Sequence, residues 1–185
     1  TEEQMERLVV PTLRGEIIWC QLFSEPGAGS DLASLTTSAT KVDGGWRIDG
    51  NKVWNSKAYE AHWGICLART DRDAPKHRGI SFFLVDMSAP GVEVRPLREA
   101  NGDSMFNEVV LDGVFVPDAD LVGAPGEGWK VARTTLANER VAMGNTPVAS
   151  GYRFDPVEVA RTLDPDTRHD ALPALGRITS TTGAL

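Results

Sequence analysis

The sequence predicts an α+β fold in which an antiparallel β-barrel or β-sandwich is flanked by helices. Between Glu16 and about Gly123, short runs rich in Val, Ile, Trp and Phe alternate with turn residues, at a spacing typical of antiparallel sheets. That stretch contains no helical pattern long enough to connect parallel strands. On either side of it, apolar residues recur at helical steps.

The composition is that of a globular domain. Of the 185 residues, 41% are hydrophobic and 24% are charged, which is enough apolar material for a core. The formal net charge of -7, with Lys and Arg scattered along the chain, argues against nucleic-acid binding. No apolar run approaches the roughly twenty residues that span a membrane. We therefore expect a cytoplasmic protein with neither a membrane span nor a nucleic-acid partner.

Both cysteines, Cys20 and Cys66, lie within apolar runs. The sequence has no CxxC motif and no Cys/His cluster, so it predicts no metal site. Two buried, reduced thiols are favoured over a disulfide.

Changes of pattern divide the chain into three segments. Residues 1–15 resemble the end of an N-terminal helical domain, terminated by Pro11 and Gly15. Residues 16–124 form the β-domain. Residues 125–185 begin a C-terminal helical domain that is incomplete here, so the chain looks like part of a longer protein.

The expected sheet begins with a strand in residues 16–23. A hairpin follows, in which residues 38–42 meet residues 46–54 across Asp43-Gly44-Gly45, and Asp49-Gly50 mark a bulge or turn. Core candidates in its second strand are Trp46, Ile48 and Val53. Further strands are expected at residues 63–70, 80–87, 92–97 and 107–116.

A helix is expected from about Glu127 to Gly144. Glu139 falls within its apolar stripe, although a carboxylate that faces a core carries a desolvation cost. A second short helix is expected from Phe154 to Leu163, capped by Asp155, while the last ten residues give no clear pattern. The stripe itself consists of Trp129, Ala132, Leu136 and Met143.

The loop Ser24–Asp31, with the sequence SEPGAGSD, is the strongest candidate for a binding site. It directly follows an apolar strand, and its Gly27 and Gly29 permit close approach and positive φ. Such a loop can hold a phosphate or the edge of a flat cofactor. It is not the dinucleotide fingerprint, which requires a following helix. On composition alone, a tight surface turn is an equal alternative.

This loop resembles the first signature of the acyl-CoA dehydrogenase family. Further segments resemble family motifs in the same order, and the resemblance extends from about residue 1 to residue 144. These segments are Gly50–Ser56, Phe106–Val109, Val116–Pro117 and Gly126–Trp129.

The resemblance implies that FAD is the cofactor. Ser24 would lie near the flavin pyrimidine edge and Trp54 would cover the ring, although without the resemblance Trp54 reads as a core tryptophan. Ser56 would donate toward flavin N5, where negative charge grows. Asn55 stands where the family often has Ile, so the packing behind Ser56 is expected to differ from that of other members. The implied FAD contacts are Gln21, Leu22, Phe23, Ser24, Gly29, Ser30, Trp54, Asn55 and Ser56.

For the substrate, the resemblance implies contacts from Ser30 and Arg140. Glu139-Arg140 is similar to the Glu-Arg pair that supplies the catalytic base in the isovaleryl and long-chain branches of the family. We therefore expect Glu139 to remove the substrate α-proton, with a pKa raised by burial. Two alternatives stay open: a structural ion pair, or a base located in a C-terminal part that this chain lacks.

The reaction implied is α,β-dehydrogenation of an acyl-CoA thioester, with an electron-transfer flavoprotein as electron acceptor and a homo- or hetero-oligomeric assembly. Alternatives are an acyl-CoA oxidase or flavin monooxygenase of the same fold, a non-catalytic supporting subunit, and a binding barrel without FAD. Residues 1–185 alone are expected to be inactive and to bind FAD weakly or not at all.

Overall fold

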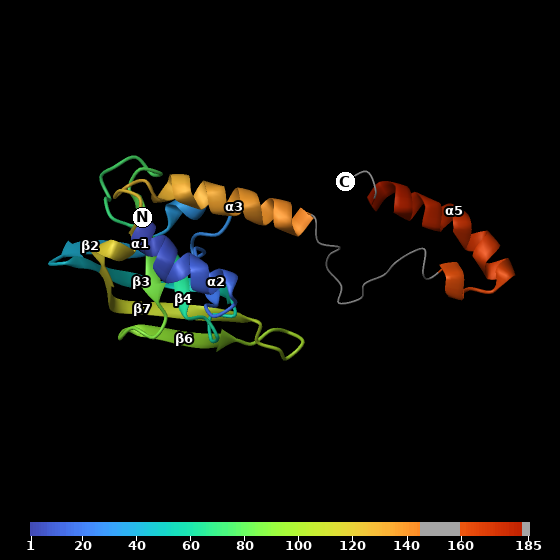
Figure 1. Cartoon of the computed structure of the whole chain (residues 1–185), viewed down its shortest axis with the longest axis horizontal. Coiled ribbons are helices and arrows are strands. Elements are labelled where there is room, and N and C mark those ends of the chain that lie inside the picture. The colour runs from blue at the N-terminus through green and yellow to red at the C-terminus, as the bar shows by residue number, and fades with distance from the viewer. Residues whose placement is uncertain (145–159, 183–185) are drawn as a thin grey trace. The chain divides into compact units, whose positions relative to one another are not determined.

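The computed structural model describes residues 1–144 and 160–182. The chain separates into two compact units, Thr1–Thr134 and Thr135–Leu185 (Figure 1). The first unit contains the sheet, and the second is helical where it is described. The domain boundaries expected after residues 15 and 124 stay predictions. In the described residues, no helix is both long and apolar enough to cross a membrane.

The elements of the first unit follow the order predicted. A helical segment is followed by eight strands, and helix α3 begins at the end of the unit. The helical segment comprises α1 (Glu2–Gln4), the π-helical turn η1 (Met5–Val9) and α2 (Val10–Leu13), and the short turns η2 (Leu32–Ser34) and η3 (Asp118–Asp120) interrupt the strands. The strands are β1 (Trp19–Leu22), β2 (Ser38–Val42), β3 (Gly45–Ser56), β4 (Trp63–Arg69), β5 (Ile80–Asp86), β6 (Val92–Leu97), β7 (Phe106–Pro117) and β8 (Leu121–Val122).

The predicted α+β fold with a sandwich-like sheet is confirmed. The strand order is β6-β7-β3-β2-β4-β5-β8, with β1 pairing with β4, and the sheet does not close into a barrel. Most pairings are antiparallel, but β1 and β2 both pair with β4 in parallel, which makes the sheet mixed. Only one residue pair, Ser38 and Arg69, joins β2 to β4, so the sheet is almost divided into two halves there.

The core lies between these two halves. Trp46 from β3 meets Phe83 from β5 edge to face, with ring centroids 5.6 Å apart. Trp46 and Ile48 are buried, as predicted. Val53 is only half-buried, and the fully buried residue beside it is Lys52. Side chains alternate between faces along a strand, so position 52, not position 53, continues the inward series of Trp46 and Ile48.

The β2–β3 hairpin also forms as predicted. Gly44 takes a φ of +70° at the turn, which a glycine adopts without steric cost. The register shifts at the predicted position, between the pairs Ile48–Val114 and Gly50–Leu111, but the extra residue lies in β7 and not in β3. Asp49 accepts a hydrogen bond from the Gly113 amide of β7 at 2.8 Å across this irregularity.

The N-terminal helical segment contacts β1, β4 and η3. Arg7 stacks over the Trp63 ring at 5.3 Å and forms an ion pair with the buried Asp120. The Trp19 indole donates to the Thr12 hydroxyl at 2.8 Å. These polar contacts fix the segment that leads into β1.

Cys20 and Cys66 are both free and buried, which confirms the prediction of two reduced thiols. Burial raises the pKa of Cys20 to about 12 and that of Cys66 to about 11. Neither thiol has the lowered pKa that a reactive nucleophile requires.

Helix α3 (Gly128–Gly144) confirms the predicted helix, but α5 (Pro165–Thr182) was not predicted. A local signal for α5 exists in the sequence. The Asp164 carboxylate accepts hydrogen bonds from the amides of Asp166 and Thr167, and Pro165 occupies the first helical position. Most of the helix expected from Phe154 to Leu163 lies outside the described residues.

Candidate functional site

The two segments expected to bind a cofactor lie side by side. The Val53 amide donates to the Ser24 carbonyl at 2.9 Å, so the loop after β1 pairs directly with the end of β3. The loop turns back at once, because Glu25 and Ala28 exchange two backbone hydrogen bonds around Pro26-Gly27. The fold thus places Ser24 next to the Trp54–Ser56 segment, so both segments can contact the same ligand.

A buried ion pair beneath the loop holds this arrangement. Lys52 and Glu25 are 0% and 5% exposed, and the Lys52 Nζ lies 2.9 Å from Glu25 Oε1. The ammonium also donates to the carbonyls of Phe23 and Leu67, at 3.1 and 2.8 Å. Three hydrogen bonds use all of its protons, so the buried cation is fully satisfied. It connects the loop to β3 and β4.

The Glu25 carboxylate is equally well satisfied. Besides Lys52, it accepts from the Thr36 amide and hydroxyl, both at 2.7 Å, and from the Thr37 amide at 2.9 Å. Burial alone would raise the pKa of this carboxyl, but the Lys52 charge and the hydrogen bonds from Thr37 and Thr36 outweigh it and lower the pKa to about 2. Glu25 is therefore a structural anion and not a proton donor.

Trp54 is presented to solvent by an irregular strand end. It has a φ of +63°, which is uncommon for any residue other than glycine, and its side chain is 63% exposed. Its ring packs against Phe106 in a T-shaped arrangement, with 6.0 Å between ring centroids and the planes at 82°. An indole that is largely exposed offers apolar surface on which a flat ligand can stack.

The other predicted cofactor residues differ in how much of the side chain a ligand can reach. Leu22, Phe23 and Asn55 are buried as whole residues, so in this chain they lie behind the surface that a ligand can reach. Gln21 and Ser24 are half-buried. Those that are exposed, besides Trp54, are Gly29, Ser30 and Ser56.

The far end of the loop lies open. A Cβ built on Gly29 would meet no atom within 4 Å, so a ligand can approach the backbone there. The next residue but one, Asp31, pairs with Lys76 at 2.5 Å and accepts from the Ser34 hydroxyl at 2.6 Å. The hydrogen bond from Lys76 lowers the pKa of Asp31. These contacts join the loop to the charged segment between β4 and β5.

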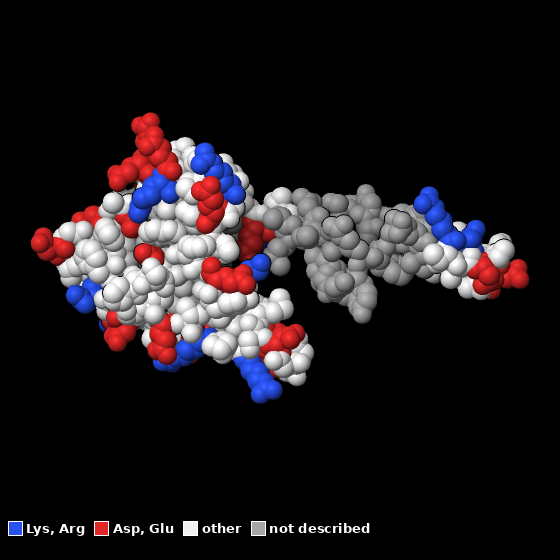
Figure 2. Space-filling view, turned by 60° about the horizontal axis from the view of Figure 1, so that its bottom comes forward, with Lys and Arg blue, Asp and Glu red and all other residues white. Residues whose placement is uncertain are grey.

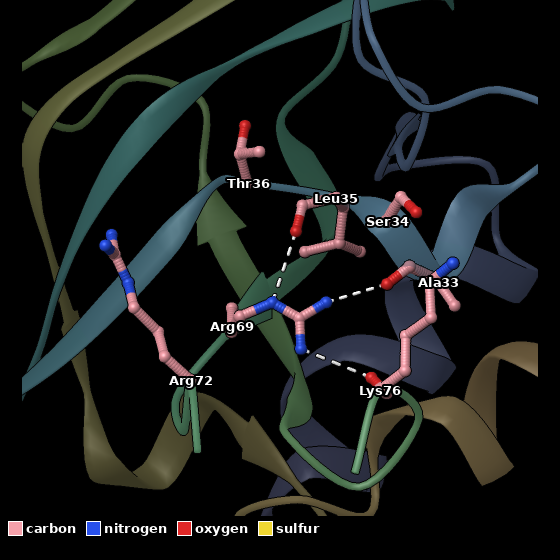
Figure 3. Close-up of a pocket in the computed structure, with 7 residues that line it drawn as sticks. All are labelled: Ala33, Ser34, Leu35, Thr36, Arg69, Arg72 and Lys76. Carbon is pink, nitrogen blue, oxygen red and sulfur yellow. Dashed lines mark hydrogen bonds between the residues drawn. The ribbon is translucent and has the colours of Figure 1, made fainter. Parts of the chain in front are cut away.

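A pocket of about 330 Å³ adjoins this end of the loop (Figure 3). Arg69, Arg72 and Lys76 line it together with residues 33–36. The Arg69 guanidinium donates to the carbonyls of Ala33, Leu35 and Lys76, so it is used as a structural clamp. On the face of the first unit seen in Figure 2, acidic and basic side chains are interspersed.

The predicted substrate residues Glu139 and Arg140 lie on α3, within the second unit. Both are exposed, so the burial expected to raise the pKa of Glu139 is not seen in this chain. The reason is local: α3 is buried at Gly128 and Ala132, near its start, while Leu136, one turn before Glu139 on the expected stripe, is only half-buried. The structure gives no relation between Glu139 and the loop of the first unit.

The comparisons with known proteins agree on one family. The sequence profile described as "Acyl-CoA dehydrogenase, middle domain" matches residues 20–114. Acyl-CoA dehydrogenase FadE34 of Mycobacterium tuberculosis is 69% identical over 143 residues, which cover 77% of this chain and 20% of that protein. Human mitochondrial short-chain specific acyl-CoA dehydrogenase is 33% identical over 78% of this chain and 35% of its own length.

Solved structures give the same result. The structure named "Tcur3481-Tcur3483 steroid ACAD" superposes with a TM-score of 0.79 at 33% identity, over all of this chain and 48% of that one. Acyl-CoA dehydrogenase from Geobacillus kaustophilus superposes with a TM-score of 0.73 at 31% identity, over 78% of this chain and 39% of that one. The chain thus spans less than half the length of each of these relatives.

Proposed function

The chain belongs to the acyl-CoA dehydrogenase family, and from that premise we propose that the full-length protein dehydrogenates an acyl-CoA thioester between its α and β carbons, with FAD as cofactor. One observation carries the proposal: the Ser24 carbonyl is bonded to the Val53 amide, immediately before the exposed Trp54. The segments that would face a flavin are therefore neighbours in space.

The residues present fit a flavin. Trp54 offers an exposed indole for the isoalloxazine ring, and the hydroxyls of the half-buried Ser24 and the exposed Ser56 would meet its polar edge. The open backbone at Gly29 and the Ser30 hydroxyl suit the pyrophosphate. The half-buried Gln21 would line the site beside them, with Leu22, Phe23 and Asn55 packed behind this surface. When bound, FAD supplies the acceptor for the β-hydride.

In this proposal, Glu139 removes the α-proton and Arg140 orders the substrate beside it. Both side chains are exposed in this chain and therefore available to a ligand or to further polypeptide. A carboxylate becomes a useful base when its surroundings raise its pKa toward neutrality. We expect parts of the protein beyond these residues to provide that environment.

We further propose that the electrons leave to an electron-transfer flavoprotein and that the protein functions as an oligomer. A solved structure named for the electron transferring flavoprotein of Acidaminococcus fermentans superposes with a TM-score of 0.73 at 27% identity. The ChsE4-ChsE5 complex from Mycobacterium tuberculosis superposes with a TM-score of 0.73 at 26% identity over this whole chain. These likenesses favour a hetero-oligomer as one form of the assembly.

A second candidate is a supporting subunit that binds FAD or a partner without removing the proton. The exposure of Glu139 favours this alternative. An anaerobic titration of the full-length, FAD-loaded protein with straight-chain and steroid side-chain acyl-CoA thioesters tests both. Dehydrogenation predicts bleaching of the flavin by at least one thioester, and the supporting role predicts none.

The Glu139→Gln variant tests the assignment of the base. We expect it to retain FAD but to slow flavin reduction by about a thousandfold or more, since proton removal by a positioned base contributes this much. Asp170→Asn removes an exposed carboxylate from α5 and is the matched control. Near-normal reduction in Glu139→Gln would assign the base to another residue.

A further inference from the structure

The strand that carries Trp54 is irregular where it pairs with β7. Between the pairs Lys52–Val109 and Asn55–Asn107, β3 advances three residues while β7 advances two, so β3 contains one extra residue. The Val53 amide bonds to Ser24 within this bulge. A bulge breaks the regular ladder and re-aims the side chains around it.

Immediately after the bulge, two asparagines bond across the strands. Asn55 Nδ2 donates to the Asn107 carbonyl at 3.1 Å, and Asn107 Nδ2 donates to the Asn55 carbonyl at 3.0 Å. The two side chains are 1% and 0% exposed. We call this reciprocal pair of bonds the asparagine lock.

The lock stabilises the strand pair less than an apolar pair at these positions would. The Oδ1 atoms of Asn55 and Asn107 are buried and have no hydrogen-bond partner among the described residues. A buried acceptor without a donor is unfavourable, and an apolar pair of similar size would avoid this cost. The arrangement therefore gives something other than stability.

What the lock determines is the backbone on either side of Asn55. Trp54 has its φ of +63° and Lys57 has a φ of +57°, and such conformations persist only where the surroundings enforce them. The lock fixes the carbonyl of Asn55, the residue between Trp54 and Ser56 in the chain. It also bonds the carbonyl of Asn107, whose neighbour Phe106 packs against Trp54.

We propose that Asn107, together with Asn55, is a positioning residue that sets the orientation of Trp54 and Ser56 toward the flavin. The inference rests on the proposed function for the identity of the ligand. Its structural part, the orientation of Trp54, does not need the ligand. Asn107 itself is not among the proposed cofactor contacts, and it acts through its two bonds with Asn55 and through its neighbour Phe106.

The main test compares Asn107→Leu with Asn51→Leu in the full-length protein. Asn51 is the matched control, since it lies on the same strand pair and its Nδ2 bonds across to Glu108 at 2.7 Å, before the bulge. For Asn107→Leu we expect the dissociation constant of FAD to rise about tenfold or more, with a shifted visible spectrum and reduction potential of the bound flavin. For Asn51→Leu we expect changes below about twofold.

A second measurement is independent of FAD. The fluorescence of Trp54 in the flavin-free protein is obtained by subtracting the spectrum of Trp54→Phe in each background. Asn107→Leu is expected to change the acrylamide quenching of this signal by about twofold, while Asn51→Leu leaves it unchanged. Asn107→Thr keeps a hydroxyl donor and a strand-forming side chain, and it replaces Asn107→Leu in the test if that variant does not fold. Its change in Trp54 quenching should be smaller than twofold but still larger than that of Asn51→Leu.

The outcomes separate the two proposals. A wild-type protein that takes up no FAD, with Trp54 quenching altered by the Asn107 variants, refutes the proposed function and supports the lock. Unchanged Trp54 quenching in the Asn107 variants overturns the lock, whether FAD binds or not. Equal losses of FAD affinity in Asn51→Leu and Asn107→Leu also overturn it, because the effect would then reflect general weakening of the strand pair.

Discussion

The ammonium of Lys52 lies 2.9 Å from the carboxylate of Glu25, and both groups are withdrawn from solvent. The pair lies directly beneath the Ser24 turn, and its remaining hydrogen bonds reach Phe23, Leu67 and the start of β2. Because both charges are desolvated, removal of either partner leaves the other buried and unpaired.

Replacement of Lys52 by Met should lower the free energy of unfolding by about 3–5 kcal/mol, since Glu25 is left as an uncompensated buried charge. The urea unfolding midpoint of the full-length protein measures the change. Lys41→Met is the control, because Lys41 pairs with Asp118 at 2.6 Å at an exposed position. Exposed pairs contribute about 1 kcal/mol or less.

The double variant Lys52→Met/Glu25→Gln should recover much of that loss, because no charge then remains buried. Strict additivity of the two single effects would mean that the pair is not coupled. In that case the account of the loop as held by an ion pair would be wrong.

Acid should weaken the same pair. The pKa of Glu25 is lowered from 4.5 to about 2 in the folded chain, so its stabilising contribution is present above pH 4.5 and is lost as the pH falls from 4.5 toward 2. We expect the difference in urea midpoint between wild type and Glu25→Gln to shrink across this interval and to be constant from pH 5 to pH 7. A difference that does not vary with pH would contradict the assignment.

Trp54→Leu should weaken FAD binding in the full-length protein by about tenfold, the loss expected when one stacked aromatic ring is removed. Its folding should change little, because the side chain is 63% exposed. Phe115→Leu truncates another exposed aromatic side chain, on β7, and should leave FAD affinity unchanged. Equal affinities in wild type and Trp54→Leu would remove Trp54 from the flavin site.

Gly128→Ala should destabilise the start of α3 by about 1–3 kcal/mol, as overpacking does. A Cβ at Gly128 would lie 2.3 Å from the carbonyl carbon of Ser81 and 2.6 Å from the Phe82 amide nitrogen, and both are backbone atoms of β5 that cannot move aside. At Gly176, in α5, an added Cβ meets nothing within 4 Å. Gly176→Ala should therefore not lower the thermal midpoint, and an equal drop in both variants would argue against the close contact.

Local patterns were enough to predict most strands. Alternating apolar residues and the Asp43-Gly44-Gly45 turn gave the hairpin, because these signals act over only a few residues. Asp49-Gly50 marked the position of a register shift but not the strand with the extra residue, which is β7. The burial of Lys52 was missed, since a lysine is assigned to the surface unless its partner is known. That partner, Glu25, is 27 residues away. The sequence did hold one signal: Lys52 lies an even number of residues from Trp46 and Ile48 and therefore on the same face of the strand.

Neither the conformation of Trp54 nor the asparagine lock could be predicted from the sequence. Both depend on the register between β3 and β7, which shifts within the bulge and has no single-residue signature. The adjacency of the Ser24 turn and the Trp54–Ser56 segment was expected only from the family resemblance. The geometry bears out that adjacency, while the roles of Glu139 and Arg140 stay predictions.

A crystal structure of the full-length protein with FAD tests the central claim most directly. The account predicts that the isoalloxazine ring stacks on Trp54, with the hydroxyls of Ser24 and Ser56 within hydrogen-bond distance of its polar edge. An isoalloxazine ring bound elsewhere, with Trp54 covered by polypeptide, would contradict it.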